Sequence, residues 1–184
     1  MSVHIALLRA INVGGHNKVR MSDLRELCGA LGLAGATSLL QSGNLVFQSD
    51  QLTGAALEDL LEVETAKRLN VTADYLIRTA ADWAKIVARN PFPKEAKNDP
   101  GHLLVMFLKA APSAKSVDAL QAAIEGPEIV RSDGKQLYII YPAGIGRSKL
   151  TGTLIERKLG TRGTGRNWNT VLKLQERCTS ARGA

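Results

Sequence analysis

The chain has 184 residues, 45% of them apolar, and a formal net charge of +7 at pH 7. This length and apolar content exclude a disordered chain and predict one domain, or two small domains that share a core. No apolar run approaches the ~20 residues that span a bilayer, and the apolar start is too short for a signal peptide, so we expect a cytoplasmic protein without a membrane partner.

The first part of the chain is predicted to alternate strands with helices. Strands are expected over residues 3–11, 37–41, 44–48 and 75–78, with a hairpin turn at Ser42-Gly43. Helices are expected to begin at the capping residues Ser22, Thr53 and Thr79, and to end at Gly32, at Leu69 and before Pro91. The polar residues 94–100 are flanked by Pro, which predicts a loop or linker.

The same alternation restarts at residue 102. Strands are expected over residues 102–108, 128–131 and 136–141, the last two joined by a hairpin at Asp133-Gly134. Helices are expected over residues 113–124, 148–159 and 167–177, the second of them capped by Ser148. Residues 163–166 contain two glycines and are interpreted as a loop before the last helix.

The order strand-helix-strand-strand-helix therefore occurs twice. The first copy adds the strand at residues 75–78, which completes a ferredoxin-like βαββαβ unit, whereas the second copy ends in an extra helix. The predicted fold class is α+β, with two ferredoxin-like units in duplication and antiparallel sheets that carry helices on one face. We place the first unit at residues 1–90 and the second unit, with its extra C-terminal helix, at residues 101–178.

The positive charge is concentrated in the last quarter of the chain. Residues 144–184 hold nine Lys and Arg against two Glu, whereas the 15 basic and 15 acidic residues elsewhere cancel. Such asymmetry favours a polyanionic partner, which here means a nucleic acid or a nucleotide.

Four segments of the chain resemble the signature segments of a known family. They are Arg-Ala-Ile-Asn-Val-Gly-Gly at residues 9–15, Gln-Ser-Gly-Asn at 41–44, Ser-Lys-Leu-Thr at 148–151 and Arg-Asn-Trp-Asn-Thr-Val-Leu-Lys-Leu at 166–174. Over nearly its whole length the chain resembles a bacterial family known only as domain of unknown function 1697. The resemblance implies a duplicated ferredoxin-like α+β fold and implies no activity. The chain departs from the family pattern at Ala10, His16, Arg162 and Gly165.

Three basic loops that contain glycine each lead into a predicted helix start, and they begin at Gly14, Gly144 and Gly163. Backbone N–H groups in such loops, the unpaired donors of a helix start and a nearby Arg or Lys can together hold a phosphate group. Each loop also has a simpler interpretation, a turn that requires glycine and carries solvated charges. The predicted ligand-binding residues are Arg9, Asn12, Lys18, Arg147, Ser148, Lys149, Arg166, Asn167 and Asn169.

Within this set, Arg147, Lys149 and Arg166 would carry the charge, and Lys18 and Arg9 would add to it. Because one short helix separates the loops at Arg147 and Arg166, we expect these two loops to converge.

Other chemistry has weaker signals in the sequence. Trp168 either stacks on a base or packs the last helix, and we favour packing. No cofactor and no metal are expected, because the His and Cys residues lack partners at ligand spacing. These residues are His4, His16, His102, Cys28 and Cys178. No phosphate-binding fingerprint or nucleophile elbow occurs.

Three functions stay open from the sequence. The first is binding of a phosphate-bearing ligand, either a nucleic-acid backbone or a nucleotide, through the basic loops. The second is an enzyme that acts on a small phosphorylated substrate at the same loops, with Ser148, Asn167 or Asn169 as hydrogen-bonding groups. The third is a protein-interaction module with a basic C-terminal surface. A monomer is favoured, and the sequence does not decide whether the chain is an enzyme.

Overall fold

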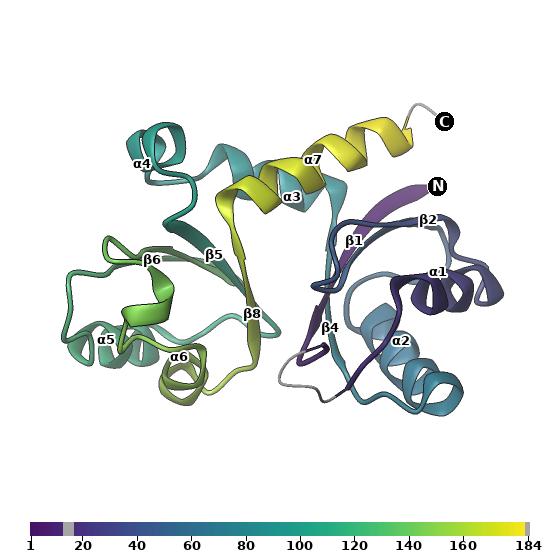
Figure 1. Ribbon diagram of the computed structural model, residues 1–184, viewed down its shortest axis with the longest axis horizontal. Coiled ribbons are helices and arrows are strands. Elements are labelled where there is room, and N and C mark those ends of the chain that lie inside the picture. Colours follow the sequence, from purple (N-terminus) through teal and green to yellow (C-terminus); the bar gives the residue numbers. More distant parts are fainter. Residues whose placement is uncertain (13–16, 183–184) are drawn as a thin grey trace. The chain divides into compact units, whose positions relative to one another are not determined.

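The computed structural model describes residues 1–12 and 17–182 and separates into two compact units (Figure 1). Unit 1 comprises Met1–Ile86 and Lys173–Ala184, and unit 2 comprises Val87–Leu172. Each unit has its own sheet and its own apolar core, so each is described by itself.

Unit 1 is built on a four-stranded antiparallel sheet with the strand order β2-β3-β1-β4. The strands are β1 (Ser2–Arg9), β2 (Ala34–Ser38), β3 (Asn44–Ser49) and β4 (Asp74–Thr79). The helices are α1 (Met21–Ala30), α2 (Gly54–Leu69) and α3 (Ala80–Ala88), which follows β4 directly. Helices α1 and α2 cover one face of the sheet (Figure 1), where Leu24, Phe47, Leu57 and Tyr75 form part of the core.

Unit 2 has a second four-stranded antiparallel sheet, with the order β6-β7-β5-β8. The strands are β5 (Leu103–Leu108), β6 (Ile129–Asp133), β7 (Gln136–Ile140) and β8 (Gly163–Asn167). The helices are α4 (Pro93–Asn98), α5 (Ala114–Ala122) and α6 (Gly152–Leu159), with a short 3-10 turn, η1 (Ile145–Arg147), before α6. The last helix, α7 (Trp168–Arg182), begins in unit 2 and belongs to unit 1 from Lys173 onward. Helices α5 and α6 cover one face of this sheet (Figure 1), over a core that includes Leu108, Leu120, Leu137 and Ile155.

The predicted α+β class with antiparallel sheets is confirmed, and so are both hairpins. Strand β2 pairs with β3, and Gly43 in the connection has a positive φ, as predicted. In the second hairpin Asp133 pairs with Gln136, so the turn residues are Gly134 and Lys135, one position later than expected. The predicted linker at residues 94–100 is largely the helix α4.

The predicted loop at residues 163–166 is wrong, because this segment is the strand β8. Unit 2 therefore ends with a strand and a helix, as β4 and α3 do in the first part of the chain. The glycines of β8 serve close packing and not turn formation. A Cβ atom at Gly163 would lie 2.7 Å from the carbonyl oxygen of Phe107, and one at Gly165 would lie 2.9 Å from the Leu104 side chain. A strand without apolar alternation has no sequence signal of period two.

Two of the four predicted helix caps, Thr53 and Thr79, are found where they were expected. Helix α2 follows Thr53, and at the start of α5 Ser113, which was not predicted as a cap, accepts a hydrogen bond from the Ser116 amide. Thr79 and Asp82 form the predicted reciprocal pair at α3, with Asp82 N donating to Thr79 Oγ1 at 3.1 Å.

The other two helix starts were misplaced by one to a few residues. Helix α1 begins at Met21 after Arg20, so Ser22 lies inside the helix and is not its cap. Helix α6 begins at Gly152 after Thr151, whose hydroxyl accepts from the Leu154 amide at 3.2 Å, so Ser148 is not the cap of this helix. Near α6 both Ser148 and Thr151 can cap a helix, and hydrogen-bonding potential alone does not choose between them. The cap position of α1 is Arg20, whose side chain makes no capping hydrogen bond, so no cap residue marks this start in the sequence.

Glutamates of α2 in unit 1 and of α6 in unit 2 cover the outer edges of β4 and β8. The amides of Tyr75 and Ile77 donate to Glu62 Oε1 and Glu58 Oε1 at 2.9 and 2.8 Å. In unit 2 the amide of Gly163 donates to a glutamate of α6, Glu156, at 2.9 Å. These carboxylates occupy the donors that would otherwise pair with the strand of another chain.

His4 makes the stability of unit 1 depend on pH. Its side chain is 1% exposed in β1 and is stacked on Phe47, with ring centroids 6.0 Å apart. No hydrogen-bond partner for Nδ1 occurs among the described residues. Burial lowers the pKa of this imidazole below 6.5, although the Ser49 carbonyl and the Asp50 charge act in the opposite direction. The folded state therefore holds His4 neutral.

We expect unit 1 to lose stability as the pH falls below about 6.5, because the unfolded chain then takes up a proton that folded His4 does not. The loss should grow until the pH reaches the lowered folded pKa. Urea denaturation at about pH 7.5 and about pH 5.5 measures it, and the His4→Phe variant should show a smaller drop. An equal drop in both proteins would mean that other groups set the pH dependence.

Candidate functional site

The nine residues predicted to bind the ligand fall into two sets in the structure. Arg9, Asn12 and Lys18 belong to unit 1. Arg147, Ser148, Lys149, Arg166, Asn167 and Asn169 belong to unit 2. The Gly14-Gly15-His16 part of the first predicted loop lies outside the described residues.

Arg166 is a structural residue of β8 and not part of a phosphate-binding loop. It is 8% exposed and pairs with Val105 of the neighbouring strand. Its Nη1 donates to Thr164 Oγ1 at 2.7 Å and to the Gly165 carbonyl at 2.8 Å. Burial lowers the pKa of its guanidinium to about 10. The expected loop at Arg166 is therefore wrong, because residues 163–167 form the strand β8. Arg147 is exposed in the 3-10 turn η1.

The residues after Arg166 begin helix α7. Asn167 Oδ1 accepts the Thr170 amide at 3.0 Å, which is the hydrogen bond of a helix cap. Trp168 is buried, as the packing interpretation predicted. Asn169 is exposed on the first turn of the helix. Of these three side chains, two therefore stabilise the start of α7.

Ser148 and Lys149 are bound to carboxylates of the connection between α5 and β6. The Ser148 hydroxyl donates to Glu128, and its oxygen accepts the Leu150 amide at 2.9 Å. Lys149 Nζ lies 2.8 Å from Glu125 Oε2. Their hydrogen bond raises the pKa of Lys149 and lowers that of Glu125. A phosphate at this loop would have to compete with two carboxylates, which argues against the predicted cradle.

Arg9 and Asn12 hold the connection between β1 and α1 in place. Arg9 Nη1 forms an ion pair with Asp74 Oδ2 at 3.0 Å. The Asn12 amide nitrogen donates to the carbonyls of Val19 and Gln41, both at 3.1 Å, and its Oδ1 accepts the Val19 amide at 3.0 Å. Asn12 adopts a φ of +53°, a conformation that Asn tolerates better than most residues. This side chain therefore fixes the backbone on both sides of the connection.

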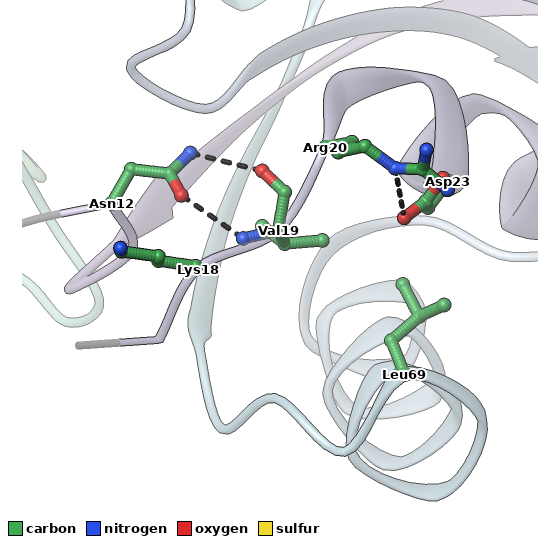
Figure 2. Close-up of a pocket in the computed structure, with 6 residues that line it drawn as sticks. All are labelled: Asn12, Lys18, Val19, Arg20, Asp23 and Leu69. Atoms are coloured by element: carbon green, nitrogen blue, oxygen red, sulfur yellow. Dashed lines mark hydrogen bonds and ion pairs between the residues drawn. The ribbon is translucent and has the colours of Figure 1, made fainter. Parts of the chain in front are cut away.

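An open pocket lies beside this connection in unit 1 (Figure 2). Its volume is ≈ 520 Å³, and its walls are Asn12, Lys18, Val19, Arg20, Asp23 and Leu69. Lys18 is exposed, and no carboxylate among the described residues forms an ion pair with it. Arg20 is bound to Asp23 at 3.0 Å, as the dashed contact in Figure 2 shows for the same pair. The pocket thus combines one unneutralised ammonium group with an apolar wall.

The equivalent connection of unit 2 is shorter and is hydrogen-bonded to the segment before β8. There β5 and α5 are joined by residues 109–113, whereas β1 and α1 are joined by residues 10–20. The Ala110 amide donates to Thr161 Oγ1 at 3.1 Å, and the Lys109 amide donates to the Arg162 carbonyl at 2.9 Å. Long connections on a rigid scaffold are where binding residues concentrate. The contrast between the two units points to the connection at residues 10–20.

Sequence reasoning missed the opposite wall of the pocket and one histidine pair. Leu69 ends α2 and comes to the pocket only through the fold of unit 1. His102 Nδ1 lies 2.7 Å from Asp99 Oδ2, a contact that the sequence analysis did not predict. The spacing of these two residues was visible in the sequence, but it is not a metal-ligand spacing.

Within residues 1–12 and 17–182 no group of three or more His, Cys, Asp and Glu side chains gathers at one point. The described helices include none with the length and apolar content needed to traverse a bilayer.

Comparison with known proteins gives a family and a fold. The sequence model of a family described as a protein of unknown function, DUF1697, matches residues 1–138. The chain is also similar to the solved structure of conserved bacterial protein SP0830 from Streptococcus pneumoniae, at 22% identity and a TM-score of 0.75. That match covers 96% of this chain and 98% of the other. No curated protein matches the chain.

Proposed function

The chain belongs to the DUF1697 family of proteins of unknown function, and from the geometry of unit 1 we propose that it binds a phosphate-bearing ligand in the pocket beside Lys18. The observation that carries this proposal is the ammonium group of Lys18, which has no ion-pair partner among the described residues and borders an open pocket. Positive charge without a carboxylate partner attracts phosphate oxygens.

The shape of the pocket favours a nucleotide or a similar small phosphate ester over a nucleic-acid backbone. Its volume of ≈ 520 Å³ falls in the range of small-molecule sites, roughly 300–1,000 Å³. Leu69 and Val19 offer an apolar wall for a base or sugar, and the ion pair of Arg20 with Asp23 leaves little additional charge for further phosphates. A nucleic-acid strand would need a longer row of cations.

The pocket is also held in shape before any ligand arrives. Asn12 ties Val19 to the Gln41 carbonyl, and Asn17 Nδ2 donates to the carbonyls of Ala10 and Thr72, both at 3.1 Å. A site whose backbone is fixed loses less conformational entropy on binding. The two asparagines therefore support the proposal by preorganising the walls of the pocket.

We further propose that the two units are a duplicated ferredoxin-like fold in a cytoplasmic protein. Arg78 faces Ile5 in unit 1 as Arg166 faces Val105 in unit 2, and each donates to the carbonyl of the preceding residue. A helix follows each of these strands directly. Both cysteines are buried and unbridged, which suits a reducing compartment.

The experiment is a binding titration by calorimetry with AMP, ADP, a sugar phosphate and inorganic phosphate. We expect one of the esters to bind the wild-type chain, and the Lys18→Ala variant to bind it about tenfold or more weakly, since hydrogen bonds to charged groups contribute ~1.5–3 kcal/mol. Lys18→Arg should retain most of the affinity. Lys115→Ala, which removes an exposed lysine of α5 in unit 2, is the matched control and should bind as the wild type does.

Salt dependence separates a small ligand from a polyanion. The affinity for a nucleic acid falls as the salt concentration rises. On duplex DNA the logarithm of the affinity falls by about 0.9 per log unit of salt for every phosphate that the protein neutralises. For a nucleotide in the Lys18 pocket, the slope of log affinity against log salt should correspond to about one phosphate contact. Wild-type affinity for every phosphate ester in the Lys18→Ala variant would refute the site.

A further inference from the structure

A second pocket of unit 1 lies between the connection after β2 and the outer side of α7. Its volume is ≈ 430 Å³, and it is lined by Leu39, Lys173, Glu176, Arg177 and Ser180. All five residues belong to unit 1, and none of them is part of the pocket beside Lys18. The proposed function does not use this groove.

Two cations of the groove lie one helical turn apart on α7. Lys173 and Arg177 are both exposed, and neither forms an ion pair with a carboxylate among the described residues. Like charges at this spacing destabilise a helix slightly, by ~0.2–0.5 kcal/mol. The buried side of the helix is formed by Leu174 and Cys178, so the two cations are not needed for packing.

The opposite wall is a rigid turn that presents an apolar side chain to solvent. The Leu39 amide donates to the Asn44 carbonyl at 3.0 Å, and Asn44 Nδ2 donates back to the Leu39 carbonyl at 2.8 Å and to Ser42 Oγ at 2.9 Å. The next residue, Leu40, is 55% exposed and has a φ of +61°. A left-handed backbone conformation has a steric cost for leucine. The turn therefore keeps Leu40 exposed in a conformation that leucine rarely adopts.

The helix wall is fixed to the same sheet. Gln48 Nε2 of β3 donates to the Ala181 carbonyl near the end of α7 at 2.7 Å. Because β3 also begins at Asn44, one strand holds both the turn and the helix, and the groove keeps its width without a ligand.

We propose that this groove binds an acidic peptide segment of a partner protein. Carboxylates of the peptide pair with Lys173 and Arg177, and an apolar side chain of the peptide packs on Leu39 and Leu40. Glu176, the one acid of the lining, then accepts a backbone N–H of the peptide. The two cations of the groove are complementary to the acidic side chains of such a peptide.

A peptide fits the groove better than a nucleic acid does. The phosphate backbone has no N–H donor for Glu176 and would be repelled by its carboxylate. The lining residues include no aromatic side chain on which a base could stack. An acidic peptide satisfies the cations, the carboxylate and the leucines together.

The test uses fluorescence anisotropy with a short fluorescein-labelled peptide composed of Asp, Glu and Leu. Two matched peptides carry Asn and Gln in place of the acids, or Ser in place of Leu. The full-length chain should bind the first peptide and bind each matched peptide at least about fivefold more weakly, because both the charges and the apolar contact are needed.

Variants of the chain locate the binding on the groove. The double variant Lys173→Glu with Arg177→Glu should weaken peptide binding about tenfold or more, whereas Lys115→Glu, the same change on α5, should leave it unchanged. Leu40→Asn is the sharpest variant, because Asn tolerates a positive φ and should keep or raise the stability while binding weakens. Lys18→Ala should bind the peptide normally, which separates this surface from the phosphate pocket.

Three results would overturn the proposal. The first is no binding of the acidic peptide by the wild-type chain at low salt. The second is an equal loss in the Lys115→Glu control, which would show general charge attraction. The third is binding of single-stranded RNA that depends on Lys173 and Arg177 and exceeds peptide binding, which would assign the surface to nucleic acid.

Discussion

Replacing Glu58 with alanine is expected to lower the free energy of unfolding by about 1–3 kcal/mol, the range for leaving a buried hydrogen-bond donor without its acceptor. Glu58 is a buried acid on α2, and its carboxylate accepts the Ile77 amide at the edge of β4. Its charge also favours the protonated form of Arg78, which is itself buried and whose pKa is lowered by desolvation. The variant would leave a backbone donor and a guanidinium in a dry environment.

Urea denaturation followed by circular dichroism measures the effect. Asp59→Ala is the matched control, because Asp59 is exposed on the next position of the same helix and should change the stability by less than about 0.5 kcal/mol. Glu58→Gln keeps an acceptor for the Ile77 amide and should fall between the two. If Glu58→Ala unfolds at the same urea concentration as Asp59→Ala, the carboxylate has no role at the edge of β4.

The elements with strong apolar patterns could be predicted from the sequence. Strand β1 is apolar from Val3 to Leu8 except at His4, and its neighbour β3 follows Gly43, a turn residue that is recognisable in the sequence. The hairpin of unit 2 is marked by Asp133 and Gly134, although the turn lies one residue later. In these segments local preference and tertiary structure agree, so sequence reasoning succeeds.

The strand β8 could not be predicted, because its glycines are required by the close approach of the neighbouring strand β5. Gly163 and Gly165 have no side chain, and Thr164 and Arg166 carry no apolar alternation. Only the backbone of Phe107 and the side chain of Leu104, distant in sequence, explain why glycine is required. Such a constraint arises from tertiary packing and has no local signature.

Only part of the candidate site could be predicted from the sequence, for a similar reason. Lys18 and Asn12 stand in a segment that the sequence marks as a long loop, and both line the pocket. The engagement of Lys149 by Glu125 depends on the fold, because the two residues are far apart in the chain. A count of basic residues treats every cation as available, whereas the structure shows which ones already have a partner.

Replacing Arg166 with alanine is expected to destabilise unit 2 by about 2 kcal/mol or more and to leave phosphate binding by the folded protein unchanged. The guanidinium of this buried side chain donates to Thr164 Oγ1 and to the Gly165 carbonyl, which are partly buried acceptors, and hydrogen bonds to a charged group contribute ~1.5–3 kcal/mol. Thermal and urea denaturation measure the stability, and the calorimetric titration described for Lys18 measures the binding.

Two further variants separate a structural arginine from a ligand-binding one. Arg157→Ala removes an exposed arginine of α6 and should change the stability by less than about 0.5 kcal/mol. Arg166→Lys keeps the charge but loses the planar donor geometry, so it should recover only part of the stability. Sequence reasoning expected the reverse pattern, with Arg166 dispensable for folding and required for binding. A contrary result is an Arg166→Ala protein that is as stable as Arg157→Ala but no longer binds phosphate. Such a protein would show that Arg166 binds the ligand and does not stabilise β8.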